Sequence, residues 1–207
     1  MKTITKEMQN SISPSMALNL LKEGNRRFVN NLKINRNLLQ QVNETSDGQH
    51  PFAVILSCID SRTSAELIFD KGLGDVFSVR IAGNIINEDI LGSMEFGCKV
   101  AGAKIIVVLG HTKCGAIKGA CDNVELGNLT SLISKIKPAV DLENSTTKNR
   151  DSSNSIFVEN VAELNVALSV KTILLKSAII SEMVKNDDIT IVGGVHDIST
   201  GEVKFFE

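Results

Sequence analysis

The chain has 207 residues, of which 43% are hydrophobic and 22% charged, and its formal net charge is -2 at pH 7. This length and composition predict one globular domain over residues 1–207, with enough chain to bury a core. Because the charge is near zero and no basic block occurs, we expect neither nucleic acid nor a membrane as a partner. The N-terminal residues lack the apolar stretch of a signal peptide, and the most apolar segment carries Lys171, Lys176 and Glu182. We therefore expect a cytoplasmic protein, whose four cysteines act as thiols or metal ligands.

Apolar periodicity predicts strands that alternate with helices. An N-terminal helical arm over residues 1–35 has a helix that opens at Ser13-Pro14, a typical cap and first helical position. Residues 1–12 are polar, and we expect them to be loosely held or packed on a partner. The predicted strands are residues 52–57, 75–81, 104–109, 188–192 and 202–206. The predicted helices are residues 63–69, 88–101, 113–121, 126–142 with a break at Pro138, and 158–185 as one helix or two. The polar stretches 30–48 and 141–155 are predicted to be connections on the surface.

This order predicts an α/β fold with a mostly parallel β-sheet of about four strands, flanked by helices. The last two strands are separated by the short turn signal Ser199-Thr-Gly201. We therefore expect them to pair antiparallel, with the fifth strand at an edge of the sheet.

Two stretches that carry chemistry directly follow buried strands. Cys58 follows the first strand, and His111 and Cys114 lie in the connection after the third. A parallel sheet can place these strand ends side by side, and two thiolates with one imidazole are ligands that zinc prefers. Three protein ligands are the number found in a catalytic zinc site, which keeps one position open. Asp60 remains an alternative fourth ligand.

The other cysteines and histidines have simpler interpretations. Cys98 and Cys121 lack a partner at ligand spacing, and we expect them to be small buried hydrophobic side chains. His50 and His196 also lack such a partner. A redox pair is a weaker alternative, because no Cys-x-x-Cys motif occurs.

A zinc site beside Asp60 and Arg62 permits a narrow range of chemistry. Zinc lowers the pKa of bound water to near 7 and so supplies hydroxide at neutral pH. A neighbouring Arg62 keeps Asp60 ionised, and an ionised carboxylate only accepts hydrogen bonds. Asp60 can therefore take the hydroxide's proton in a hydrogen bond and direct the oxygen at an electrophile. The apolar residues Ile59, Phe77 and Phe96 suit a small, weakly polar substrate.

At these residues the sequence resembles the β-class carbonic anhydrases. Cys58-Ile-Asp60-Ser61-Arg62 matches the family's Cys-x-Asp-Ser-Arg, and His111-Thr-Lys-Cys114-Gly115 matches its His-x-x-Cys-Gly. Residues 21–28, 79–84 and 194–201 resemble further family segments, so that the likeness runs from about residue 15 to the C-terminus.

The resemblance implies a zinc ion on Cys58, His111 and Cys114, and a catalytic pair of Asp60 and Arg62. It implies reversible hydration of carbon dioxide to bicarbonate and a proton by zinc-bound hydroxide. It also implies a homodimer or homotetramer, with the active site near the interface and the N-terminal helix laid across the neighbour.

The plant-type branch of the family further implies a substrate pocket of Gln49, Phe77 and Phe96. Phe96 stands where a tyrosine is common, which removes one hydroxyl group from the pocket. His196 also stands where a tyrosine is usual, and it is either a proton shuttle or a structural residue of the edge strands. Ile55, Ser57 and Thr63 differ from the residues of the bicarbonate-inhibited branch, which argues against that type.

Two rival functions remain at this stage. Carbonyl sulfide and carbon disulfide hydrolases resemble this family and share its ligands. A non-catalytic zinc protein would instead use Asp60 as a permanent fourth ligand, although such a site needs neither Arg62 nor Gln49.

Overall fold

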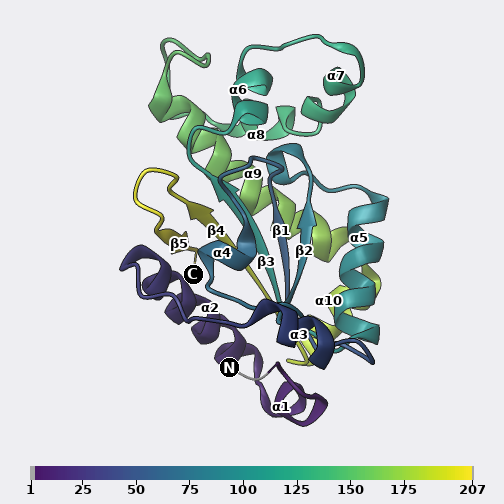
Figure 1. The fold of residues 1–207 in the computed structure, drawn as a ribbon. Coiled ribbons are helices and arrows are strands. Elements are labelled where there is room, and N and C mark those ends of the chain that lie inside the picture. The colour runs from purple at the N-terminus through teal and green to yellow at the C-terminus, as the bar shows by residue number, and fades with distance from the viewer. Residues whose placement is uncertain (1–2, 207) are drawn as a thin grey trace.

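The computed structural model describes residues 3–206, in which one five-stranded sheet lies between two layers of helices (Figure 1). The strands follow the order β2-β1-β3-β4-β5 across the sheet. The first four strands are parallel, and β5 is antiparallel to β4 at one edge. Their bounds are β1 (Ala53–Ser57), β2 (Val76–Arg80), β3 (Ile105–His111), β4 (Thr190–His196) and β5 (Val203–Phe205). The predicted fold class, including the antiparallel edge strand, is confirmed.

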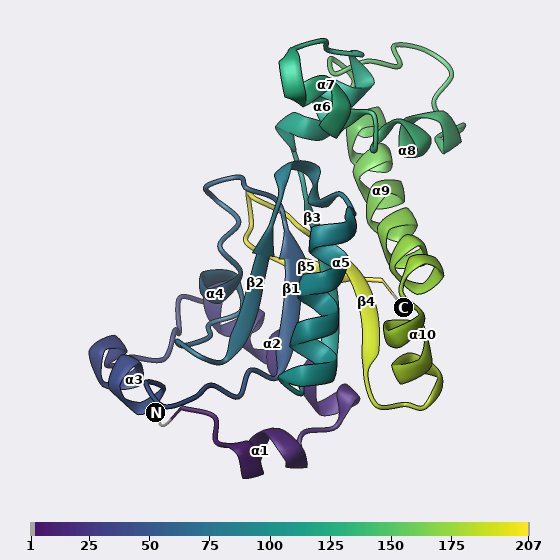
Figure 2. The ribbon, with the colours of Figure 1, turned by 90° about the vertical axis from the view of Figure 1, so that its right-hand side faces the viewer.

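The helices cover both faces of this sheet. Figure 2 shows α5, α9 and α10 on one side of the strands and α2 and α4 on the other. The helices are α1 (Lys6–Ser11), α2 (Pro14–Val29), α3 (Leu38–Glu44), α4 (Ala65–Ile68), α5 (Glu88–Glu95), α6 (Gly115–Cys121), α7 (Gly127–Ile133), α8 (Lys137–Leu142), α9 (Ser155–Lys176) and α10 (Ala178–Lys185). A 3₁₀ turn, η1 (Ala82–Asn84), follows β2, and a π-helical turn, η2 (Phe96–Val100), continues α5.

The two central strands are apolar along their whole length because both of their faces are covered. Every residue of β1 and of β3 is buried. Successive side chains of a strand point to opposite faces. Val54, Leu56, Ile106 and Val108 accordingly share a hydrophobic cluster with α5, α9 and α10. Ala53, Ile55, Ile105 and Val107 share another cluster with Ala17 and Leu21 of α2 and Ile68 of α4. These strands therefore form the core, and their ends are held rigidly.

The N-terminal segment packs on its own chain. Residues 1 and 2 lie outside the described residues, but residues 6–11, which we expected to be loosely held or packed on a partner, form α1. Gln9 is fully buried, and its amide donates to the carbonyl oxygens of Pro51 (2.7 Å) and Ala101 (2.8 Å). A polar side chain that satisfies buried main-chain acceptors holds this helix in place, and apolar periodicity does not register such a contact.

Two polar stretches that we predicted as connections are more ordered than expected. The first contains α3, which is capped by Asn37. In the second, the buried carboxylate of Glu143 accepts hydrogen bonds from the main-chain N–H groups of Ser145 and Thr146 and pairs with Arg150 at 2.8 Å. The polar residues of this loop therefore serve one buried acceptor, while most of their neighbours are exposed.

The predicted helix 158–185 is two helices. Asn154 caps α9, and Ser177 separates it from α10 by donating its main-chain N–H to Ile173 while its hydroxyl accepts from Ile180. Within residues 3–206, no single helix is long and apolar enough to cross a membrane. α9 and α10 reach that length and hydropathy only as a pair, which is bent by 98°.

Candidate metal centre

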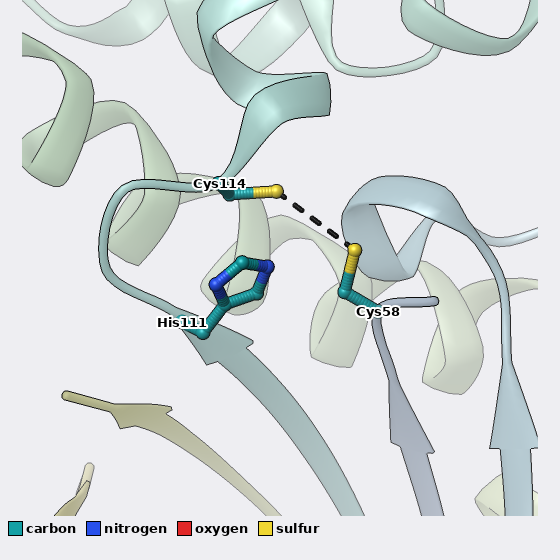
Figure 3. A group of neighbouring side chains, drawn as sticks. All are labelled: Cys58, His111 and Cys114. Atoms are coloured by element: carbon teal, nitrogen blue, oxygen red, sulfur yellow. Dashed lines mark hydrogen bonds between the residues drawn. The ribbon is translucent and has the colours of Figure 1, made fainter. Parts of the chain in front are cut away.

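The strand ends bring Cys58, His111 and Cys114 together. Ser57 pairs with Leu109, so that the residues following β1 lie beside the last residues of β3. β3 is two residues longer than predicted, because Gly110 and His111 pair with Val195 and His196 of β4. His111 is therefore a strand residue, where we had placed it in the connection. Cys114 caps α6 three residues later, and Figure 3 shows all three side chains turned toward one another.

The donor atoms of these three residues are close enough to share one ion. The two Sγ atoms are 4.0 Å apart, and all three donor atoms lie within 4.8 Å of one another. Each residue is buried, with at most 4% of its surface exposed. Two sulfurs and one imidazole nitrogen at such separations fit a tetrahedral zinc site that keeps its fourth position open.

The imidazole of His111 is oriented for ligation. Its Nδ1 lies 3.0 Å from the carbonyl oxygen of Thr112, which can only accept, so that Nδ1 carries the proton. Nε2 then presents its lone pair, and it is buried without a hydrogen-bond partner among the described residues. A buried nitrogen with a free lone pair is the arrangement that a metal ion satisfies.

The sulfur atoms of Cys58 and Cys114 lie within hydrogen-bond distance of each other. A hydrogen bond from Cys114 lowers the pKa of Cys58 well below that of a free thiol, with further donation from the main-chain N–H of Gly83 at 3.3 Å. The same hydrogen bond, together with burial, raises the pKa of Cys114. A divalent cation would stabilise both sulfurs as thiolates.

The turn η1 positions the amide that faces Cys58. Gly83 has φ +65°, a conformation that residues with a side chain adopt at a cost. Asn165 of α9 donates to the Gly83 carbonyl oxygen at 2.9 Å and so anchors the turn. Sequence reasoning missed this contribution of Gly83, although residues 79–84 were recognised as resembling a family segment.

Asp60 lies beside the three ligands but is directed at Arg62. The Nη2 group of Arg62 donates a hydrogen bond to Oδ2 of Asp60 at 2.7 Å. Its Nε and its main-chain N–H donate to Oδ1 at 2.9 and 3.0 Å. These hydrogen bonds hold the pKa of Asp60 far below its usual range, so that the carboxylate is ionised at neutral pH. Among residues 3–206, the clustered ligands include Cys58, His111 and Cys114 but not Asp60. The arrangement leaves Asp60 free to accept a hydrogen bond rather than to close the site.

The predicted pocket residues lie away from the metal ligands of the same chain. Gln49 is exposed and precedes β1, whereas Cys58 follows its other end, about 13 Å of strand further on. Phe77 pairs with Val54 near the start of β1. Phe96 contacts Phe77 edge to face at 6.1 Å and is 53% exposed. The structure thus brings the two aromatic rings together, but neither they nor Gln49 reach Cys58 within one chain.

His196, Cys98 and Cys121 occupy the interior, whereas His50 is half-buried. His196 is buried beside His111. Its pKa is lowered to about 4, mainly by burial and to a smaller extent by repulsion from His111. Cys98 and Cys121 lie in hydrophobic clusters, where burial raises their pKa to about 12 and about 11. Both thiols stay protonated at neutral pH, as small hydrophobic side chains do.

The fold and this site define an α/β protein with a buried Cys₂His metal centre beside an ionised carboxylate. A family model described as carbonic anhydrase matches residues 53–203. Carbonic anhydrase 2 of Mycobacterium tuberculosis is 35% identical over 197 residues, covering 91% of each chain. The solved β-carbonic anhydrase CafA of Aspergillus fumigatus superposes with a TM-score of 0.72 at 26% identity, covering 93% of this chain and 90% of that one. A tetrameric β-carbonic anhydrase of Sordaria macrospora superposes with a TM-score of 0.68 at 24% identity, covering 93% of this chain and 94% of that one. This chain belongs to the β-class carbonic anhydrase family.

Proposed function

We propose that Cys58, His111 and Cys114 hold the zinc ion with which this enzyme hydrates carbon dioxide reversibly to bicarbonate and a proton. One observation carries the assignment: the two thiols of Cys58 and Cys114 converge with the unpaired Nε2 of His111, beside a carboxylate that is paired with Arg62. When bound, zinc supplies a water molecule whose pKa is lowered to near neutrality.

In this proposal Asp60 orients the attacking water. Because the carboxylate is ionised, it can only accept, and it fixes the water by accepting one of its hydrogen bonds. A water held this way directs an oxygen lone pair away from Asp60 and toward the carbon of carbon dioxide. Arg62 acts through Asp60 by holding both carboxylate oxygens.

We further propose that Gln49, Phe77 and Phe96 contribute to substrate binding only in a dimer. In one chain they lie too far from Cys58, and β2 is an edge strand whose outer side has no partner strand among the described residues. Phe77 and Phe96 line a surface hollow of about 590 Å³ beside this edge. A second copy on this edge would bury the exposed ring of Phe96 and bring the three residues toward the partner's metal centre. The tetrameric β-carbonic anhydrase of Sordaria macrospora supports an assembly of more than one copy.

A cytoplasmic location is also part of the proposal. Its support is that all four cysteines are free thiols, the state that a reducing compartment maintains. Cell fractionation with an antibody to the chain tests it, and recovery outside the cytoplasm would contradict it.

The assignment is tested by measuring zinc content and carbon dioxide hydration together. Cys58→Ser should lose zinc and activity, because a serine hydroxyl is a poor zinc ligand. Cys121→Ala is the matched control, since it removes a buried cysteine that lies outside the ligand group, and it should keep both. A Cys58→Ser variant that keeps its zinc and hydrates carbon dioxide at the wild-type rate would show that Cys58 is not a zinc ligand. Turnover of carbonyl sulfide or carbon disulfide in place of carbon dioxide, on the same preparation, would support the sulfur hydrolases instead.

A further inference from the structure

The loop that carries Cys58 and Asp60 lies outside the sheet. The β1–β2 ladder ends at the pair Ser57 and Arg80, and one further main-chain bond joins Ile81 N–H to the Ser57 carbonyl oxygen at 3.1 Å. Residues 58–60 have no helix or strand of their own. The position of a metal ligand and of the catalytic carboxylate therefore depends on other contacts.

The side chain of Arg80 provides two of these contacts. Its Nε donates to the carbonyl oxygen of Cys58 at 3.0 Å, and its Nη2 donates to the carbonyl oxygen of Asp60 at 2.6 Å. A guanidinium group is planar, and its donors keep a fixed spacing, so that one side chain sets the distance between these two carbonyl groups. The hydroxyl of Thr63 lies within hydrogen-bond distance of the same two oxygens, at 3.2 and 2.9 Å.

From these contacts we propose that Arg80 is a positioning residue of the active site, which holds Cys58 and Asp60 in register by their main-chain carbonyl groups. The proposal rests on the proposed function, since it concerns the same site. It differs from the role of Arg62, which contacts the carboxylate of Asp60, because Arg80 contacts neither that carboxylate nor the sulfur of Cys58 by any hydrogen bond in the structure.

The effect of losing Arg80 should appear in turnover rather than in substrate affinity. Displacements of about 1 Å in a catalytic group can lower a rate by about a hundredfold. Because Thr63 still restrains the loop, we expect Arg80→Gln to lower kcat per bound zinc by at least tenfold, with KM nearly unchanged. Arg80→Lys keeps the charge and one donor group, and it should recover part of the loss.

The test compares these variants with Arg150→Gln as a matched control. Arg150 also donates to two main-chain carbonyl oxygens, those of Val140 and Thr146, but in the loop organised by Glu143. Arg150→Gln should lower the melting temperature and leave kcat per zinc unchanged. The second readout is the rate at which a chromophoric chelator removes zinc, which should rise several-fold in Arg80→Gln and not in Arg150→Gln.

These readouts separate the two proposals. A kcat per zinc within twofold of wild type in Arg80→Gln would overturn the role of Arg80. An equal loss of kcat per zinc in Arg80→Gln and Arg150→Gln would overturn it as well. If zinc-loaded wild-type protein shows no turnover, the proposed function fails, and the chelator rate alone then decides on Arg80. An unchanged rate of zinc removal in that case would overturn the positioning role.

Discussion

The turn at Gly83 makes a sharp prediction, because the structure shows two separate penalties for adding one methyl group. At φ +65° an alanine is strained, at a cost of about 1–2 kcal/mol for an L-residue in the left-handed region. The new Cβ would also lie 2.6 Å from Cδ1 of Ile136 and 3.2 Å from Cβ of Ala116. The end of the isoleucine can move, whereas the alanine cannot move without its helix, so that overpacking adds about 1 kcal/mol, at the low end of its usual range.

Gly83→Ala should therefore lower the free energy of unfolding by about 2–3 kcal/mol, or the melting temperature by about 5–10 °C for a chain of this length. Urea denaturation of zinc-loaded protein at fixed protein concentration measures this loss. Gly119→Ala is the matched control, because Gly119 lies inside α6 and its added Cβ would meet only Val124, at an ordinary contact distance of 4.0 Å. That variant should be more stable than wild type by about 0.5–1 kcal/mol. A Gly83→Ala variant within 0.5 kcal/mol of wild type would refute the reasoning about this turn.

Three further substitutions test other parts of the structure. Asp60→Asn should keep zinc but lower kcat/KM by about a hundredfold or more, because an amide can donate as well as accept; a rate equal to wild type would remove Asp60 from the mechanism. Asp70 is buried, which alone would raise its pKa, but hydrogen bonds from Arg27 and Arg36 outweigh burial and lower it. Because the pKa of Asp70 is lower in the folded state, its ionised form stabilises the fold at pH values above the unfolded-state pKa of about 3.9. This stabilisation is lost as the pH falls below that value. Urea denaturation should accordingly show Asp70→Asn much less stable than wild type at pH 7, and the gap should narrow below about pH 4; a constant gap would contradict this. Glu143→Gln should cost about 2 kcal/mol by weakening charge-assisted hydrogen bonds to a buried acceptor, with kcat/KM per zinc unchanged.

The parts of the fold that could be predicted from the sequence are those determined by burial of apolar residues. Continuous apolar runs locate β1 and β3 because both faces of these strands are covered. The short turn at residues 199–201 likewise predicts the antiparallel pairing of β4 and β5. α1 and α3 could not be predicted this way, because each is held by a side-chain amide. Gln9 donates to main-chain carbonyl oxygens, and Asn37 caps a helix whose apolar residues Leu38, Leu39 and Val42 are exposed.

At the site, residue type and position after a strand were sufficient to find Cys58, His111 and Cys114. The hydrogen bonds around these residues were not predictable, because they depend on which donors the folded main chain and its neighbours present. The amide of Gly83 contacts Cys58, which lies 25 positions earlier in the chain, and the guanidinium of Arg80 contacts Cys58 and Asp60, which lie 22 and 20 positions earlier. Nothing in the spacing of the motifs indicates these contacts. The separation of Gln49 from Cys58 by the length of β1 likewise becomes apparent only when the register of the sheet is known.

The most direct test of the central claim is stopped-flow hydration of carbon dioxide by protein with one zinc per chain, at about pH 7 and about pH 8.5. The hydrogen bonds from Arg62 keep Asp60 ionised and paired with Arg62 at both pH values, so that we predict fast turnover at both. Fully zinc-loaded protein without turnover at either pH would contradict the assignment of this site as a carbonic anhydrase centre.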